Sequence, residues 1–183
     1  MARPREFDTE KALAALRDVF WEHGYEGTSY ADIMAATGLR KGSLYAAFGD
    51  KRALYLAGLA HYDSGHVSAA VSMLSNEELS GAERIGAMMQ SLVDAAETKR
   101  GRWGCLLCNA AVDQAPFDAS TQSAVLGSMN RMKASIAKAL KGTQAADKVE
   151  TVWALYFGGR VLIKSGASKA VLKALKTQTL SLL

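Results

Sequence analysis

The sequence predicts an all-helical protein, in which a small N-terminal head of three helices precedes a larger helical body. Apolar residues recur three or four positions apart along most of the chain, and no segment alternates as a strand would. Two short helical patterns between residues 28 and 54 are joined by a turn that suits only a helix-turn-helix. With 49% hydrophobic residues, the 183-residue chain can bury a core. We expect the head at residues 1–52 and the body at residues 53–183.

The first helix of the head is expected to begin at Asp8 or Thr9, whose side chains can cap free backbone amides, and to end at Gly24. The residues on its predicted buried stripe are Leu13, Leu16 and Phe20.

The second helix follows Thr28 and Ser29, either of which can act as its N-cap. Ile33 and Met34 should face inward, and Gly38 supplies the left-handed residue that ends the helix.

The third helix begins near Arg40 and Lys41 and is barely two turns long. Leu44 and Phe48, four positions apart, form its buried side. The opposite side presents a cation, a residue without a side chain, a hydroxyl and an aromatic ring: Lys41, Gly42, Ser43 and Tyr45. Such a surface can approach base edges in the major groove of duplex DNA, while amides at the helix start face phosphates.

The ordered segment GTSYADIMAATGLRKGSLYAAFGDKRAL resembles the DNA-binding signature of TetR-family transcriptional regulators. The resemblance covers about the first quarter of the chain. It implies a homodimeric repressor that binds a palindromic operator in double-stranded DNA and dimerises through its last two long helices, with a C-terminal dimerisation and ligand domain. The residues expected to contact DNA are Ser29, Tyr30, Arg40, Lys41, Gly42, Ser43, Tyr45 and Lys51, with Arg3 or Arg5 reaching the flanking groove.

The body should begin with a long helix that is capped by Asp50, runs through Leu54 and Leu59 toward Val67, and links head to body. A polar break at 75–81 precedes a helix with Ile85, Met88, Met89, Leu92 and Val93 inside. After a basic loop at 98–104, GCLLCNAAVD starts another helix, which ends near Pro116 and Asp118.

Three helical patterns complete the body. The first has an inward stripe of Val125, Met129, Met132, Ile136 and Leu140. After a loop at 141–147, the second has an apolar face broad enough for a dimer core: Val149, Val152, Trp153, Tyr156 and Phe157. Ser168 caps the last, with Val171, Leu172 and Leu175 expected inside.

Cys105 is the candidate trigger for release of DNA. It is expected in the first turn of a helix, after Lys99, Arg100 and Arg102, and both the helix dipole and the cations favour a thiolate. Cys108 can resolve a sulfenic acid on Cys105 into a disulfide. The segment also resembles a TetR branch with an electrophile- or oxidant-responsive cysteine, in which a late lysine, here Lys164, lies near the thiol. The alternative is that both cysteines are core residues and that Lys164 stabilises a helix C-terminus.

The sequence also allows a different inducer and a different class of protein. A repressor could instead bind an apolar, non-reactive inducer among Trp103, Leu107, Trp153 and Phe157. A thiol oxidoreductase would use Cys105-Leu-Leu-Cys108, but that motif normally follows a strand. No metal site is expected, because His23, His61 and His66 lack ligand spacing, and no cofactor motif or catalytic centre is visible. Without a long apolar run or a signal peptide, and with two cysteines, the protein is expected in the cytoplasm, away from membranes.

Overall fold

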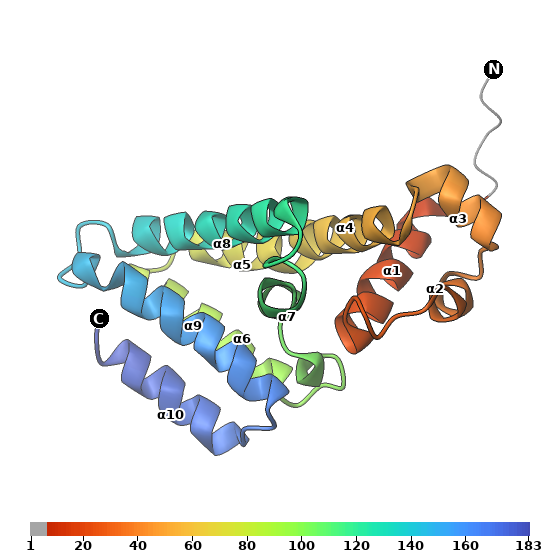
Figure 1. Ribbon diagram of the computed structural model, residues 1–183. Helices are drawn as coiled ribbons and strands as arrows, with labels where there is room; N and C mark the ends of the chain where they lie inside the picture. Colours follow the sequence, from red (N-terminus) through yellow and green to blue (C-terminus); the bar gives the residue numbers. More distant parts are fainter. Residues whose placement is uncertain (1–6) are drawn as a thin grey trace.

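The computed structural model describes residues 7–183 and consists of helices and connecting loops over that range (Figure 1). The head contains α1 (Thr9–His23), α2 (Tyr30–Thr37) and α3 (Lys41–Phe48). The body contains α4 (Lys51–Tyr62), a π-helical turn (Asp63–Val67), α5 (Ser68–Leu74), α6 (Gly81–Ala95), α7 (Leu106–Asp113), α8 (Ala119–Leu140), α9 (Val149–Lys164) and α10 (Lys169–Leu180), with 3-10 turns at Gly101–Trp103 and Ala146–Lys148. The predicted all-helical class is confirmed. The domain boundary after residue 52 stays a prediction, and it falls within the first turn of α4.

Capping side chains fix where the head helices begin. The Asp8 carboxylate accepts a hydrogen bond from the backbone N–H of Lys11 at the start of α1. Ser29 and Asp32 form a capping box at the start of α2, in which each side chain accepts from the other residue's backbone N–H. Thr28 is therefore not the cap, and its buried hydroxyl instead donates to the Gly24 carbonyl at 2.6 Å. Gly38, at φ 68°, ends α2 as expected.

A long helical run connects the head with the body. α4, the π-helical turn and α5 follow one another from residue 51 to residue 74, and Figure 1 shows this run alongside α8. Asp63, in the π-helical turn, accepts hydrogen bonds from Ser128 at 2.6 Å and from Arg131 at 2.7 Å, both on α8. The predicted linking helix is present, but the sequence pattern did not reveal the π-helical turn within it.

The body core lies between α5, α6, α8 and α9. All five apolar residues predicted for the inner face of α6 are buried: Ile85, Met88, Met89, Leu92 and Val93. On α8, Val125, Met132, Ile136 and Leu140 are buried, while Met129 is half-buried and its carbonyl accepts from the Trp153 indole N–H at 3.2 Å. The period of the apolar residues therefore predicted the inner faces of both helices correctly.

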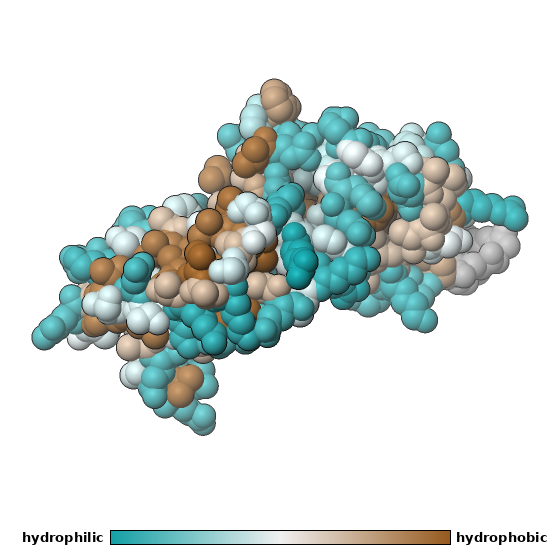
Figure 2. Space-filling model, turned by 90° about the horizontal axis from the view of Figure 1, so that it is seen from below, coloured by the Kyte–Doolittle hydropathy of each residue, from teal (hydrophilic) through white to brown (hydrophobic). Residues whose placement is uncertain are grey.

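The outer faces of α9 and α10 carry apolar side chains. Val161 is 55% exposed, Leu162 37% and Val171 46%. The expectation that Val171 points inward is wrong, because Leu172 occupies the inner side of α10 and successive helical residues point about 100° apart. Figure 2 shows apolar surface gathered over the body half of the molecule. Among the described residues, no helix combines the length and apolar character needed to cross a bilayer.

Candidate DNA-binding surface and buried thiol site

The outer face of α3 presents the side chains that the sequence predicted. Leu44 is completely buried beneath α3 and fixes its rotation, while Tyr45 is 47% exposed. Arg40 is the N-cap residue, and it makes no side-chain capping hydrogen bond. The exposed residues along the start and outer side of this helix are Arg40, Lys41, Gly42, Ser43 and Tyr45. The turn at Gly38 and the burial of Leu44 thus place a cation, a hydroxyl and a phenol on one accessible face.

Tyr30 joins α2 to this face. Its ring stacks on that of Tyr45 with 5.7 Å between centroids, and its hydroxyl donates to the Tyr45 hydroxyl at 3.0 Å. The Lys41 ammonium lies 4.6 Å from the centroid of the Tyr30 ring. Burial and the hydrogen bond with Tyr45 raise the pKa of Tyr30 to about 12, so its phenol is neutral at neutral pH. The pair orients Tyr45 before any ligand binds.

The remaining predicted contact residues have other partners in this structure. The Ser29 hydroxyl donates to the Asp32 carboxylate at 2.6 Å within the capping box. The Lys51 ammonium lies over the ring of Tyr25, 4.6 Å from its centroid. Arg3 and Arg5 lie outside the described residues. Lys41, Ser43 and Tyr45 are therefore the best-placed members of the predicted contact set.

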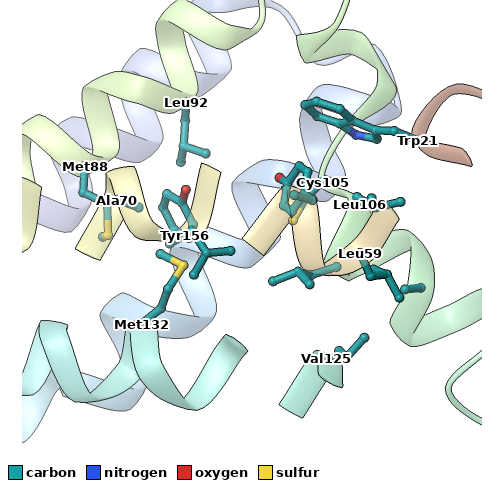
Figure 3. Close-up of a cluster of buried hydrophobic side chains, with 14 of the residues drawn as sticks. Trp21, Leu59, Ala70, Met88, Leu92, Cys105, Leu106, Val125, Met132 and Tyr156 are labelled. Atoms are coloured by element: carbon teal, nitrogen blue, oxygen red, sulfur yellow. Dashed lines mark hydrogen bonds between the residues drawn. The ribbon is translucent and has the colours of Figure 1, made fainter. Parts of the chain in front are cut away.

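Cys105 is the N-cap residue of α7 rather than a residue of its first turn, and it is only 4% exposed. Figure 3 shows it within a cluster of buried apolar side chains. The Tyr62 hydroxyl, at the end of α4, donates to the Cys105 sulfur at 3.5 Å. A hydrogen bond from Cys108 holds the pKa of Cys105 well below its ordinary value despite burial, and the Arg160 guanidinium lowers it further. The same hydrogen bond, together with burial, raises the pKa of Cys108.

A cavity of about 450 Å³ adjoins this thiol and separates α7 and α9 from the connection between α1 and α2. The residues that line it on the body side include Cys105, Cys108, Asn109, Arg160 and Lys164. The Lys164 ammonium donates to the Asn109 side-chain oxygen at 2.8 Å. The structure therefore brings Lys164 to the same cavity as both cysteines, although 56 residues separate Lys164 from Cys108 in the sequence.

The basic loop before α7 does not supply the cation beside the thiol. The Arg100 guanidinium donates to the Asp18 carboxylate of α1 at 2.6 Å, and the Lys99 ammonium lies 3.9 Å from the Glu22 carboxylate. The cation that lowers the pKa of Cys105 is Arg160 on α9, which the sequence pattern did not reveal. Its position four residues before Lys164, on the same helix face, is the signal that could have identified it.

The four residues predicted to form an aromatic pocket have separate surroundings in this structure. Trp103 packs edge-on against Trp21 of α1, with 5.6 Å between ring centroids. Trp153 and Phe157 form their own edge-on pair on α9. Leu107 instead lines a second cavity of about 500 Å³ between α4 and α8, with Leu56 and Leu59. Spacing predicted the apolar face of each helix but not which faces meet, so the four residues do not surround one cavity.

The surroundings of the Cys105-Leu-Leu-Cys108 motif differ from those of a redox enzyme. A 3-10 turn (Gly101–Trp103) and Gly104 precede it, and the described chain contains no strand. Within residues 7–183, no cluster of three or more His, Cys, Asp or Glu side chains is arranged to hold a metal ion.

The fold and the α3 face define a helix-turn-helix protein with an attached helical body. The family model for "Bacterial regulatory proteins, tetR family" matches residues 12–57, from α1 into α4. The HTH-type transcriptional regulator YezE of Bacillus subtilis is 36% identical over 120 residues, which cover 64% of this chain and 60% of YezE. The HTH-type transcriptional repressor ComR of Escherichia coli is 34% identical over 107 residues, 58% of this chain and 51% of ComR. The chain thus spans between half and three fifths of these relatives.

Solved structures match nearly the whole chain. A cysteine mutant of the TetR-family transcriptional regulator CifR, complexed with a 26-bp double-strand operator DNA, is 28% identical, with 98% of both chains covered and a TM-score of 0.83. The reduced form of E. coli NemR is 19% identical over 93% of each chain, with a TM-score of 0.80, and shows the shared fold alone. Residues 12–57 of this chain thus match the TetR family of bacterial regulatory proteins, and nearly the whole chain shares its fold with solved TetR-family regulators.

Proposed function

We propose that this protein is a homodimeric transcriptional repressor that binds a palindromic operator through the outer face of α3. The exposed array of Lys41, Ser43 and Tyr45 on a helix of eight residues is the observation that carries this proposal. Lysine donates to guanine or phosphate, and short side chains at the start of the helix let its backbone approach the DNA. Support comes from ComR, a repressor, and from CifR, a mutant of which has a solved structure in complex with operator DNA.

The second part of the proposal is that covalent modification of Cys105 by an oxidant or electrophile releases the DNA. The sulfur has a lowered pKa, lies beside a cavity, and contacts Tyr62 of the helix that connects the body with the head. An adduct on Cys105 would have to occupy space between α7, α9 and the α1–α2 connection. Release requires the modified protein to prefer a head spacing that does not fit the operator.

A non-covalent inducer is the alternative, and the cavity between α4 and α8 favours it. This cavity of about 500 Å³ has apolar walls at Leu56, Leu59 and Leu107, and polar groups at Asp63 and Arg131. An apolar ligand with one hydrogen-bonding end would fit these walls. The ligand would press on α4, the helix that leads into the head.

One operator-binding experiment tests these proposals. Operator DNA is selected from random duplexes, and affinity is measured by fluorescence anisotropy at a stated salt concentration. Tyr45→Ala should weaken binding about tenfold or more, and Lys41→Ala should also lower the salt dependence if Lys41 contacts a phosphate. Lys173→Ala, an exposed change on α10, serves as the control. Unchanged affinity in both α3 variants would contradict the proposed DNA surface.

The same assay separates the two kinds of inducer. Wild type and Cys105→Ser are compared before and after treatment with a quinone or hypochlorite, and again after reductant. The wild type should lose operator affinity on treatment, whereas Cys105→Ser should keep it. An equal response of both proteins would reject Cys105 as the switch and favour the cavity between α4 and α8.

A further inference from the structure

Arg160 lines the same cavity as Cys105 and, among the residues that the structure describes, has no carboxylate partner. Its guanidinium lines the cavity next to the thiol and donates two hydrogen bonds to the Tyr156 hydroxyl, at 2.7 and 3.2 Å. The ion pairs found within residues 7–183 do not include Arg160. A cation removed from water is costly unless an anion or several hydrogen bonds compensate it. The two hydrogen bonds to Tyr156 compensate part of this cost, and a nearby anion would compensate more of it.

Three acidic groups surround this guanidinium, and one of them ionises readily. Burial disfavours the charge of Arg160, but Tyr156, Tyr62 and Cys105 raise its pKa on balance. Burial and the neighbouring Cys105 hold the pKa of Tyr62 well above its ordinary value, so Tyr62 stays a neutral donor. Cys105 has the opposite shift and accepts hydrogen bonds from Tyr62 and Cys108. A sulfur that accepts a hydrogen bond from a neutral phenol and lines the same cavity as a guanidinium is in surroundings suited to a thiolate.

Other charged groups around the cavity are already engaged or lie on its head side. The Lys164 ammonium is hydrogen-bonded to Asn109, and the Asp113 carboxylate accepts from the backbone N–H of Tyr25. Glu22, His23 and Glu26 line the side formed by the head.

We propose that the Cys105 thiolate and the Arg160 guanidinium form a partly buried ion pair, and that Arg160 is the positioning residue that keeps Cys105 in its nucleophilic form. This inference rests on the proposed sensing role of Cys105. The ion pair would also explain, in terms of energy, why modification of Cys105 changes the protein. Alkylation converts the thiolate into a neutral thioether, because a sulfur lone pair forms the new S–C bond as the leaving group departs. Arg160 then loses its counter-ion, so the contact between α7 and α9 weakens when the adduct forms.

The test is the pH profile of Cys105 alkylation. Purified full-length wild type, Arg160→Met and Arg160→Lys react with iodoacetamide, in which the thiolate displaces iodide, from about pH 5 to about pH 9. Peptide mass spectrometry reads the rate at Cys105 separately from that at Cys108. The midpoint of the pH profile should rise by at least about one unit in Arg160→Met, which makes its alkylation about tenfold slower near pH 5, below both midpoints. Arg160→Lys, which keeps a positive charge, should return the midpoint part of the way to the wild-type value. Lys169→Met, which removes an exposed cation on α10, should keep the wild-type profile.

A profile of Arg160→Met that superimposes on the wild type, in a protein with an unchanged thermal melt, would overturn the proposed ion pair. An equal shift in Lys169→Met would also overturn it, because the effect would then be one of net charge. If Arg160→Met does not fold, Arg160→Gln replaces it, and the same shift is required.

A final arm separates this inference from the proposed function. Wild type and Arg160→Met are alkylated to completion near pH 9, where the thiol ionises without help from Arg160. The alkylated wild type should release operator DNA, whereas alkylated Arg160→Met should release it less completely, because it has no guanidinium that loses a counter-ion. If neither releases DNA but the midpoint has shifted, the ion pair stands and Cys105 is not the switch.

Discussion

Gly104 shows how a single residue allows the thiol site to form. It adopts φ 82° directly before Cys105, a conformation that L side chains rarely take. A Cβ atom at this position would lie 2.8 Å from the Cβ atom of Lys164. Glycine therefore lets the loop approach α9 closely enough for Cys105, Arg160 and Lys164 to line one cavity.

We predict that Gly104→Ala lowers the free energy of unfolding by about 2 to 4 kcal/mol, because it adds a steric clash to the backbone cost. Gly166→Ala is a matched control, since Gly166 has φ 84° but no atom within 4 Å of a Cβ built there. It should cost only about 1 kcal/mol. Urea denaturation followed by circular dichroism measures both values. Equal destabilisation by the two changes would refute the clash at Lys164.

The residues of the thiol site differ in how far the sequence predicted them. Cys105 and Lys164 were identified, because their residue types and the GCL segment carry a recognisable pattern. Arg160 was not, because arginine on a helix is usually a solvated surface residue. Lys99 and Arg100 were expected to act on the Cys105 thiol because they are close to it in the sequence. Their side chains instead pair with carboxylates of α1, which sequence proximity does not reveal.

At the scale of elements, α7 contacts the head and its linking helix at both ends. Cys105, at its start, accepts from the Tyr62 hydroxyl of α4. Asp113, its last residue, accepts from the backbone N–H of Tyr25 at 3.0 Å, in the connection between α1 and α2. Tyr62 in turn packs edge-on against Trp21 of α1, with 4.9 Å between ring centroids. A displacement of α7 would therefore be transmitted to the head through two separate contacts.

We predict that Asp113→Ala increases hydrogen exchange at the Tyr25 amide about tenfold, because one hydrogen bond to a charged acceptor contributes more than 1 kcal/mol. Asp113→Asn, which keeps a side-chain oxygen acceptor, should preserve much of the protection. Amides in the middle of α1 serve as internal controls and should exchange at wild-type rates. Exchange of Tyr25 at the wild-type rate in Asp113→Ala would show that this contact does not hold the head.

At the scale of the whole molecule, the exposed apolar residues on α9 and α10 mark the surface proposed for dimerisation. Val161, Leu162 and Val171 lie on the last two long helices, and each is more than a third exposed in the single chain. Packing these residues against a second copy would remove them from water and would set the distance between two α3 helices.

We predict that Val161→Asp converts the dimer into a monomer, as measured by light scattering after size exclusion, because burying a carboxylate in an apolar interface is unfavourable. Operator affinity should fall with it, since a monomer can occupy only one half-site at a time. Leu126→Asp on α8 is the matched control: Leu126 is 51% exposed but lies on neither helix, and this variant should remain a dimer. A dimeric Val161→Asp would place the interface elsewhere.

The sequence by itself determined the order of the helices, most of their caps, the helix-turn-helix and its outward residues. Helix periodicity, capping and turn chemistry act over a few residues, so they can be seen along the chain. Only the tertiary structure decided which helix faces meet: that Arg160 rather than Arg100 lies at Cys105, that Leu107 lines a cavity without Trp103, and that Asp113 binds the head. Arg160 is 55 positions from Cys105 and Asp113 is 88 from Tyr25, and over such separations packing and burial, rather than local pattern, select the partner.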